Sequence, residues 1–450
     1  MSVLWGLGGM LVILAIAFAF STNRRAIKPR TVIAALALQF GFGALVLYWD
    51  LGQRSLEAAS SGVTAVITSS TEGIDFLFGP ALPDNELVFA FQVLPIIVFV
   101  ASLTAVLYYL HILQWVVRII GGGLQKALGT SKTESLNATA NIFVGQTEAP
   151  LVVRPYLHSM TRSEFFAVMV GGLSTVAGTV LVGYSLLGAQ MEHLIAASFM
   201  AAPGALLMAK IIIPETEEQS MQPVLAGTAS DGRGPASTEE TEESAGATEE
   251  SSPETGSDTG STGVRLASGS SADTPDEDGP RNVIEAAARG ASDGLKLAVN
   301  VGAMLLAFIS LIALLNMLLG GIGGLFGASG LSFQDLLGYL FSPIMFVIGV
   351  PWSEAVAAGG FLGQKLVLNE FVAFAAFAPD ADQFSPKTVT ITTFALTGFA
   401  NFSSLGILLG GLGSLVPQRR WEIAELGLRA VLAGTLANLM SAAIAGILVV

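Results

Sequence analysis

Asn141-Ile142-Phe143-Val144-Gly145-Gln146-Thr147-Glu148 is a polar stretch inside a chain that is otherwise strongly apolar. The second half of the chain has its own polar stretch, Asn369-Glu370-Phe371, followed further on by Phe399-Ala400-Asn401-Phe402-Ser403-Ser404. Amide and carboxylate side chains are costly to place at membrane depth, so they usually face a cavity and carry function. One polar stretch in each half therefore predicts both the fold and the place of the functional site.

Composition assigns the chain to the membrane proteins. Of its 450 residues, 52% are hydrophobic and only 12% are charged, and the mean hydropathy is +0.66. A soluble domain carries about 25% charged residues. Apolar runs recur throughout, so we expect the first to span the membrane rather than to act as a removable signal peptide. The sequence has no cysteine, which excludes disulfides and thiolate metal sites, and its three histidines lack metal-ligand spacing.

Eight stretches are long and apolar enough to cross a bilayer, which takes about 20 residues. They are residues 3–20, 31–49, 87–110, 165–187, 194–213, 295–319, 390–415 and 428–450. Four basic residues between 21 and 30, and Gln418-Arg419-Arg420 before the last stretch, predict the cytoplasmic side. Both termini are then expected outside the cell, as is the loop 50–86, whose only base is Arg54.

The excess negative charge of the chain lies in one segment. Between Glu215 and Pro280 there are 16 acidic and two basic residues, and few apolar ones, so we predict a disordered cytoplasmic linker. The rest is formally neutral and has no basic patch for nucleic acid. The predicted divisions are three spanning helices in 1–112, an interfacial segment with a first hairpin and two spanning helices in 113–213, the linker in 214–285, an interfacial segment and one spanning helix in 286–350, and a second hairpin with two spanning helices in 351–450.

Each polar stretch begins a similar succession of elements. Residues 141–153 and 364–378 are polar tips between short apolar arms, which favours re-entrant hairpins over full spans. Each is followed by a helix interrupted by small and polar residues, at Ser174–Gly178 and at Gly398–Ser404, and then by one more helix. Counting spans gives the two interrupted helices opposite directions. The sequence therefore predicts an all-α polytopic membrane protein with an inverted-topology repeat, the layout of a secondary transporter with its site at mid-membrane.

Five separated motifs resemble the concentrative nucleoside transporters. They are Gly145-Gln146-Thr147-Glu148-Ala149-Pro150, Pro214-Glu215-Thr216-Glu217, Gly349-Val350-Pro351-Trp352, Asn369-Glu370-Phe371-Val372-Ala373 and Gly398-Phe399-Ala400-Asn401-Phe402-Ser403-Ser404. The likeness runs almost end to end, apart from a longer linker and Phe374 where many members have tyrosine. It implies a homotrimer whose protomers have eight transmembrane helices and two re-entrant hairpins, and which imports nucleosides with sodium or protons.

The resemblance also implies three groups of site residues. The nucleobase would be held by Gln146, Thr147, Glu148 and Val180. The ribose would be held by Glu370, Asn401 and Ser404, with Phe399 alongside. Sodium would be bound by side-chain oxygens of Asn141 and Thr175 and by the carbonyls of Val144, Thr175 and Val176.

These residue types suit a nucleoside. Gln146 offers both donors and acceptors to the edge of a base. An ionised Glu370 accepts hydrogen bonds strongly from ribose hydroxyls. Sodium is a hard cation that needs oxygen ligands, and a broken helix frees carbonyls to supply them.

Several alternatives remain open at the level of sequence. Thr175 could bond back to its own helix, and Asn141 could simply cap a hairpin helix. Glu148 and Glu370 could form the acid–base pair of an intramembrane hydrolase, but no His, Cys or metal motif accompanies them. A channel would need a ring-forming polar stripe. The favoured prediction is a sodium–nucleoside symporter of the inner (plasma) membrane, not an enzyme, with proton coupling as the alternative; base preference stays open.

Overall fold

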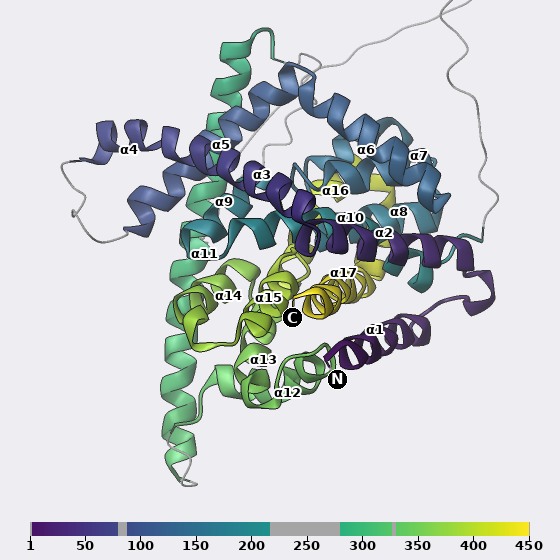
Figure 1. Ribbon diagram of the computed structural model, residues 1–450. Coiled ribbons are helices and arrows are strands. Elements are labelled where there is room, and N and C mark those ends of the chain that lie inside the picture. Colours follow the sequence, from purple (N-terminus) through teal and green to yellow (C-terminus); the bar gives the residue numbers. More distant parts are fainter. Residues whose placement is uncertain (1, 80–87, 217–279, 326–329, 450) are drawn as a thin grey trace, which may run out of the picture. The chain divides into compact units, whose positions relative to one another are not determined.

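The computed structural model describes residues 2–79, 88–216, 280–325 and 330–449, and all regular secondary structure within them is helical (Figure 1). Most of the predicted linker lies outside these residues. The chain begins with two apolar helices, α1 (Ser2–Ala19) and α2 (Pro29–Leu47), joined through a short 3-10 turn, η1 (Arg24–Ala26). These helices match the first two predicted spans.

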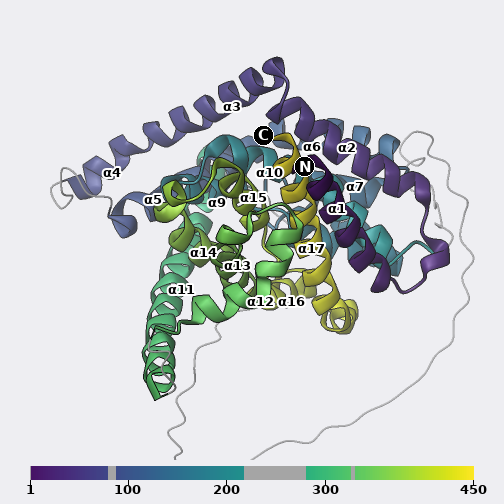
Figure 2. The ribbon, with the colours of Figure 1, turned by 60° about the horizontal axis from the view of Figure 1, so that its bottom comes forward.

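The segment expected to be an outside loop is largely helical. It holds α3 (Asp50–Ser69) and α4 (Thr71–Phe78). The buried residues of α3 recur at helical spacing, as Gly52, Leu56, Ser60 and Ile67. A narrow apolar stripe of this kind lets a mostly polar helix lie on a protein surface. The overall hydropathy of α3 is too low to predict a membrane span, so the helix was not expected from the sequence. Figure 2 shows α3 and α4 running away from the central helices.

The middle of the chain carries the first polar stretch. After α5 (Phe89–Tyr109) and α6 (Ile112–Leu128) come α7 (Lys132–Ala140) and the 3-10 helix η3 (Ala149–Tyr156), with residues 141–148 between them, which we call the first tip. The next helix breaks into α8 (Arg162–Ser174) and α9 (Gly178–Leu186), leaving residues 175–177 as the first interruption. Then comes α10 (Met191–Ile212). Ser131 and Thr161 start α7 and α8 with capping boxes, which fixes where these helices begin.

The second half repeats this order. A long helix, α11 (Val283–Leu325), leads to α12 (Phe333–Val347) and α13 (Trp352–Val367), which meet at a bend of 117°. Residues 368–369, the second tip, separate α13 from α14 (Glu370–Phe377) and η4 (Ala378–Gln383). The following helix breaks into α15 (Pro386–Leu396) and α16 (Phe402–Leu415), leaving residues 397–401 as the second interruption. The chain ends with η5 (Pro417–Arg419) and α17 (Arg420–Leu448).

All eight predicted spans coincide with helices, although not all are long enough alone. By length and composition, six helical segments among the described residues could cross a membrane, or seven with the bent pair α12–α13. They are Pro29–Leu47, Phe89–Tyr109, Arg162–Leu186, Met191–Ile212, Val283–Leu325 and Pro417–Leu448. The predicted spans 3–20 and 390–415 correspond to the shorter α1 and to the divided α15–α16.

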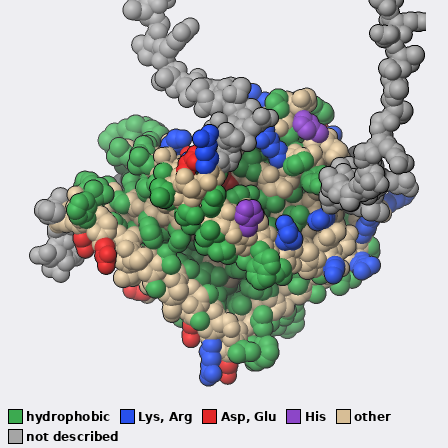
Figure 3. Space-filling view, turned by 90° about the horizontal axis from the view of Figure 1, so that it is seen from above, with side chains coloured by type: hydrophobic (Ala, Val, Ile, Leu, Met, Phe, Trp, Pro, Cys, Tyr) green, Lys and Arg blue, Asp and Glu red, His purple; other side chains and the backbone are tan. Residues whose placement is uncertain are grey.

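The apolar helices fall into an inner and an outer group. In the most apolar 18-residue stretch of each helix, 94%, 83% and 89% of the residues are buried in α8–α9, α10 and η5–α17, against 28%, 22% and 17% in α2, α5 and α11. An outer helix can be both apolar and exposed because lipid, not water, is its solvent. Apolar side chains accordingly cover much of the face seen in Figure 3. The α8–α9 segment carries the first interruption, and α17 packs against α15 and α16, the two helices that flank the second interruption.

Close approach between helices depends on glycine. Gly290 and Gly294 lie one turn apart on α11, where an added Cβ would come within 2.5 Å of Ala105 Cβ and 2.7 Å of Ala101 Cβ on α5. Small residues at this spacing let two helix backbones pack closely in a membrane. This contact holds the long outer helix α11 along α5.

Candidate functional site

The first tip is seated on the interrupted helix α8–α9. The amide of Gly178, the first residue of α9, donates to the Phe143 carbonyl at 3.1 Å. Gly172 on α8 faces Gln146 so closely that an added Cβ would lie 2.9 Å from Gln146 Cβ. Glycine is therefore required here for the tip to reach the helix. The contact places Asn141, Val144 and Gln146 beside the first interruption.

Three buried amide oxygens around the first tip accept no hydrogen bond from the residues that the structure describes. They are Asn137 Oδ1, Asn141 Oδ1 and Gln146 Oε1, and these side chains are at most 5% exposed. Leaving a buried acceptor unpaired costs about 1–3 kcal/mol, so native structures rarely keep three together. A cation or a hydrogen-bond donor from a ligand would satisfy them. The donor set of this tip thus fits the predicted sodium and nucleobase.

Thr175 and Asn141 also make the local bonds that the alternative interpretation expects. Thr175 Oγ1 donates to the Gly171 carbonyl at 2.9 Å, and Asn141 Nδ2 donates to the Asn137 carbonyl at 2.9 Å. Both bonds use the donor and leave the side-chain oxygen lone pairs for another partner. The Thr175 carbonyl, a predicted sodium ligand, accepts from the Phe399 amide at 3.2 Å. This bond joins the first interruption to the second.

Glu370 and Asn401 lie together in the second half. Glu370 begins α14 and Asn401 is the N-cap of α16. Asn401 Nδ2 donates to Glu370 Oε2 at 2.8 Å, and Asn401 Oδ1 accepts from the Ser404 amide at 2.8 Å. Three of the predicted ribose-binding residues are thus brought together by the second tip and the second interruption. All three are at most 5% exposed.

Tyr184 was not among the predicted site residues. Its hydroxyl on α9 donates to Glu370 Oε1 at 3.0 Å, so both carboxylate oxygens have a donor. The Tyr184 ring stacks on Phe374, with centroids 4.4 Å apart. A tyrosine near the end of an apolar helix is the only sequence signal, and it does not indicate its partner.

The apolar site residues lie in one cluster. Val180, Val176 and Phe371 are buried members of it, and Phe399 packs against it half-buried. The cluster joins α9 to α14. It therefore gives the region around Glu370 an apolar wall that could contact the flat face of a base.

Thr147 and Glu148 are placed differently from the rest of the first tip. Both side chains are exposed, and Glu148 leads into η3, where its carbonyl accepts from the Leu151 amide at 2.9 Å. Thr147 approaches α16, since an added Cβ on Gly411 would lie 2.8 Å from Thr147 Cγ2. In the structure as described, neither residue hydrogen-bonds to Glu370. The helix α16 thus contacts the first tip and, seven residues earlier, carries Ser404.

A buried lysine and asparagine connect the interrupted helices. Lys365 Nζ, at the end of α13, donates to the Ala395 carbonyl at 2.7 Å and to Asn438 Oδ1 at 2.9 Å. Asn438 Nδ2, on α17, donates to the carbonyls of Ser174 at 2.7 Å and Thr397 at 2.9 Å. Lys365 stood in the predicted second hairpin, but nothing in the sequence paired it with Asn438.

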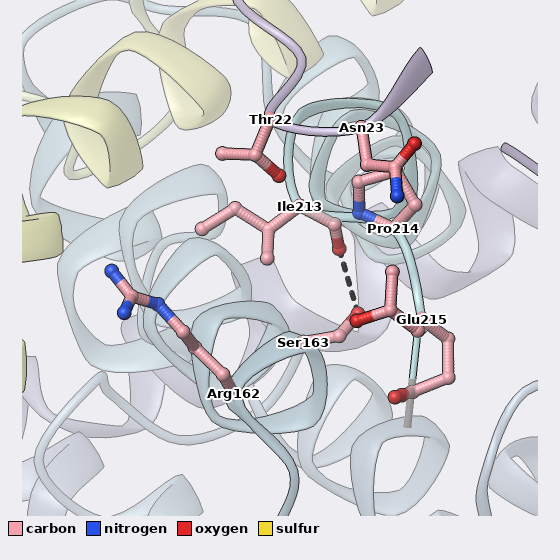
Figure 4. A pocket seen from close by; sticks show the side chains of 8 residues that line it. Thr22, Asn23, Arg162, Ser163, Ile213, Pro214 and Glu215 are labelled. Carbon is pink, nitrogen blue, oxygen red and sulfur yellow. Dashed lines mark hydrogen bonds between the residues drawn. The ribbon is translucent and has the colours of Figure 1, made fainter. Parts of the chain in front are cut away.

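A separate pocket of about 380 Å³ lies where α8 begins and α10 ends (Figure 4). It is lined by Thr22, Asn23, Arg162, Ser163, Ile213, Pro214, Glu215 and Thr216. Beside it, Lys210 Nζ lies 2.6 Å from Glu134 Oε2 and 3.6 Å from Glu215 Oε2. The buried Lys210–Glu134 pair fastens the start of α7, and with it the first tip, to α10. The pocket contains none of the predicted ligand-binding residues.

Three family models together match most of the chain. They are described as "Na+ dependent nucleoside transporter N-terminus" over residues 8–81, "Nucleoside recognition" over 90–191 and "Na+ dependent nucleoside transporter C-terminus" over 193–446. The chain is 45% identical to the nucleoside permease NupC of Helicobacter pylori, over all of this chain and 98% of that protein. It is 52% identical to the uncharacterized transporter YutK of Bacillus subtilis over the full length of both. Sodium/nucleoside cotransporter 1 of Mus musculus is 38% identical over 98% of this chain and 63% of that protein.

Solved structures share the fold. The chain resembles CNTnw in an inward-facing substrate-bound state, with a TM-score of 0.84 and 48% identity over 100% of this chain and 98% of that one. It resembles a CNTnw variant in an outward-facing state with a TM-score of 0.85 and 46% identity over the same shares. These likenesses cover every element described above.

Proposed function

Because this chain belongs to the concentrative nucleoside transporter family, we propose that it imports nucleosides by symport with sodium. The chain is a transporter and not an enzyme, so its two tip glutamates, Glu148 and Glu370, serve binding rather than hydrolysis. The observation that carries the proposal is the buried Glu370 carboxylate, held between Tyr184 and Asn401 at the second interruption.

Glu370 would receive the sugar. A carboxylate has about four lone-pair sites, so two remain after its bonds to Tyr184 and Asn401. Two neighbouring ribose hydroxyls could donate to these sites as charge-assisted hydrogen bonds. Ser404 stands beside Asn401 and would offer its hydroxyl to the same sugar, with the Phe399 ring alongside.

The first tip would receive the base and the cation. Gln146 has a buried oxygen that accepts from no donor in the described part of the chain, and amino groups on a base edge could donate to it. Thr147 and Glu148, which are exposed, would close on the base, and Val180 would pack on its face. Sodium would be held by Asn141 and Thr175 and by carbonyls of Val144, Thr175 and Val176; when bound, it supplies positive charge that draws the first tip and the first interruption together.

The architecture follows the same proposal. We take α7–η3 and α13–α14 as re-entrant hairpins, and the two halves as inverted repeats within eight transmembrane helices. The protomer would assemble as a homotrimer in the inner (plasma) membrane. Both termini would lie outside and the acidic linker in the cytoplasm.

Uptake into proteoliposomes tests the proposal. Tritiated uridine and adenosine are offered with an inward sodium gradient, with choline replacing sodium, and with an inward proton gradient in choline. Saturable uptake that requires the sodium gradient is expected. Uptake driven by the proton gradient alone would replace sodium with proton coupling, and no saturable uptake of either nucleoside would refute the proposal.

A further inference from the structure

One face of α17 meets both interruptions. The helix packs against α8 and against α15. Gly434 leaves space there for Leu173 and Ala400, whose Cβ atoms would lie 3.2 Å and 3.1 Å from an added Cβ. One turn later, Asn438 reaches the carbonyls of Ser174, the last residue of α8, and Thr397, the C-cap of α15. An added Cβ on Gly398 would collide with the Asn438 amide.

The bonds made on this face satisfy the ends of both broken helices. The last carbonyls of a helix have no partner within the helix, and inside a membrane no water replaces one. Asn438 serves Ser174 and Thr397 with the two hydrogens of a single amide group. Lys365 donates to the Ala395 carbonyl, two residues before Thr397. One connected network therefore holds the carbonyl ends on both sides of the protein's centre.

Lys365 is also a buried charge. Its side chain is fully buried, and in the described parts of the chain it makes no ion pair with a carboxylate. Glu370 is engaged by Tyr184 and Asn401 instead. The ammonium is compensated by the Ala395 carbonyl and by Asn438 Oδ1, at the carboxyl end of α15, where the helix dipole is negative. The second half thus places a buried amine that donates hydrogen bonds at a helix interruption, where the first half is proposed to bind sodium.

We infer that Lys365 and Asn438 are positioning residues that transmit sodium binding at the first interruption to the sugar-binding residues at the second. This inference rests on the proposed function. Sodium held by the Thr175 and Val176 carbonyls fixes the neighbouring Ser174 carbonyl. Asn438 transmits that constraint to Thr397, which lies four residues before Asn401. Lys365, which donates to Asn438 and lies five residues before Glu370, transmits it to the second tip.

The coupling has a direct measure. If sodium raises nucleoside affinity by some factor, that factor is the coupling between the two sites, and it acts in both directions. A network that only stabilises the fold would change unfolding and leave the factor alone. A network that transmits sodium binding would change the factor while both ligands still bind.

The experiment compares purified full-length variants. The dissociation constant of tritiated uridine is measured at saturating sodium and in choline, and the ratio of the two constants is the coupling factor. Lys365→Met removes the charge, and Asn438→Asp keeps the acceptor for Lys365 while removing both donors to the carbonyls. Each is expected to lower the coupling factor about tenfold, within the usual range of coupling free energies. Lys365→Arg is expected to restore part of the factor.

Two matched variants serve as controls. Ser441→Ala removes a buried polar group from α17, the helix that carries Asn438. Ser441 Oγ accepts a 2.7 Å hydrogen bond from Gln39 on α2, and not from either interruption. Lys296→Met removes an exposed lysine. Both should keep the wild-type factor.

The outcomes separate the two proposals. A wild-type coupling factor in a folded Lys365→Met or Asn438→Asp variant, whatever its melting temperature, would overturn the inference. A wild-type protein that binds uridine equally with and without sodium would instead refute the proposed sodium coupling. Asn438→Asp keeps the size and polarity of the side chain, so a monodisperse variant that breaks the network is expected.

Discussion

The side-chain amide of Asn401 donates a 2.8 Å hydrogen bond to Glu370, joining the first residue of α14 to the N-cap of α16 across 31 residues of chain. Asn401 Oδ1 also accepts a hydrogen bond from the Ser404 amide. The nitrogen of this side chain therefore binds the carboxylate, and its oxygen caps the start of α16. The second tip and the second interruption are therefore fixed to each other before any ligand binds, which pre-organises the proposed sugar site.

Glu370→Gln should weaken nucleoside binding. The change removes the negative charge that strengthens hydrogen bonds from ribose hydroxyls, and bonds to a charged group are worth about 1.5–3 kcal/mol, or roughly tenfold to a hundredfold in affinity. Binding of tritiated uridine to the purified protein measures this. The exposed Glu72→Gln is the control. Affinity within twofold of wild type would remove Glu370 from the sugar site.

Tyr184→Phe should act on the same carboxylate. It removes the 3.0 Å hydroxyl donor to Glu370 Oε1 and leaves a buried oxygen with less compensation, at a cost of about 1–3 kcal/mol in stability or affinity. The uridine dissociation constant and the melting temperature are measured together. Tyr339→Phe, on a ring 67% exposed, should change neither. If both quantities stay at wild-type values in Tyr184→Phe, the hydroxyl does not support the site.

Asn141→Ala should raise the sodium concentration needed for half-maximal nucleoside binding by about tenfold. The reason is the loss of a buried oxygen that has no donor among the described residues and is available to a hard cation. Asn316→Ala, which breaks a 2.9 Å bond to Gln334 elsewhere, is the control. Titration of binding against sodium at fixed pH gives the result, and an unchanged sodium dependence would contradict the assignment.

Gly398→Ala should destabilise the protein by about 1–3 kcal/mol, the usual cost of overpacking. The added methyl group would collide with Asn438, which is held on three sides by hydrogen bonds and cannot withdraw. Gly122→Ala has open space around it and should be neutral or stabilising. Thermal unfolding of both variants in the same detergent decides between them. Equal melting temperatures would show that Asn438 yields easily.

Lys210→Met should cost about 3–5 kcal/mol, because it leaves Glu134 buried without its partner. The double variant Lys210→Met/Glu134→Gln should recover much of that loss, since the uncompensated charge is gone. Thermal unfolding of the single and double variants gives the comparison. A double variant no more stable than the single one would show that the pair contributes little beyond packing.

Much of the helical framework could be predicted from local sequence. Every predicted span matches a helix because runs of about 20 apolar residues have few other stable forms in a membrane. The helix α3 could not be predicted in this way, because it is amphipathic and only one stripe of its surface is apolar. The bend between α12 and α13 was also missed, because it depends on local residues and not on a span-length pattern: Gly349 has a φ of +115° and Pro351 is the N-cap of α13.

The site was predicted in part. The polar tips could be predicted because single polar residues, such as Glu370 and Asn141, have apolar neighbours. The hydrogen bonds around the site could not be predicted. Asn438 and Ser174, for example, are 264 residues apart, and a lone asparagine in an apolar helix specifies no partner. The assignments of Gln146, Thr147 and Glu148 to a base stay predictions.

The 43 residues of α11 give a rod about 65 Å long at 1.5 Å per residue, against a hydrocarbon core of about 30 Å. Even when it is strongly tilted, a helix of this length extends beyond the hydrocarbon core. The sequence has no cysteine, so one introduced at exposed Lys296 would be the only thiol in the protein. A fluorophore there would offer a background-free reference point against which a second label on the first tip could report movement during a transport cycle.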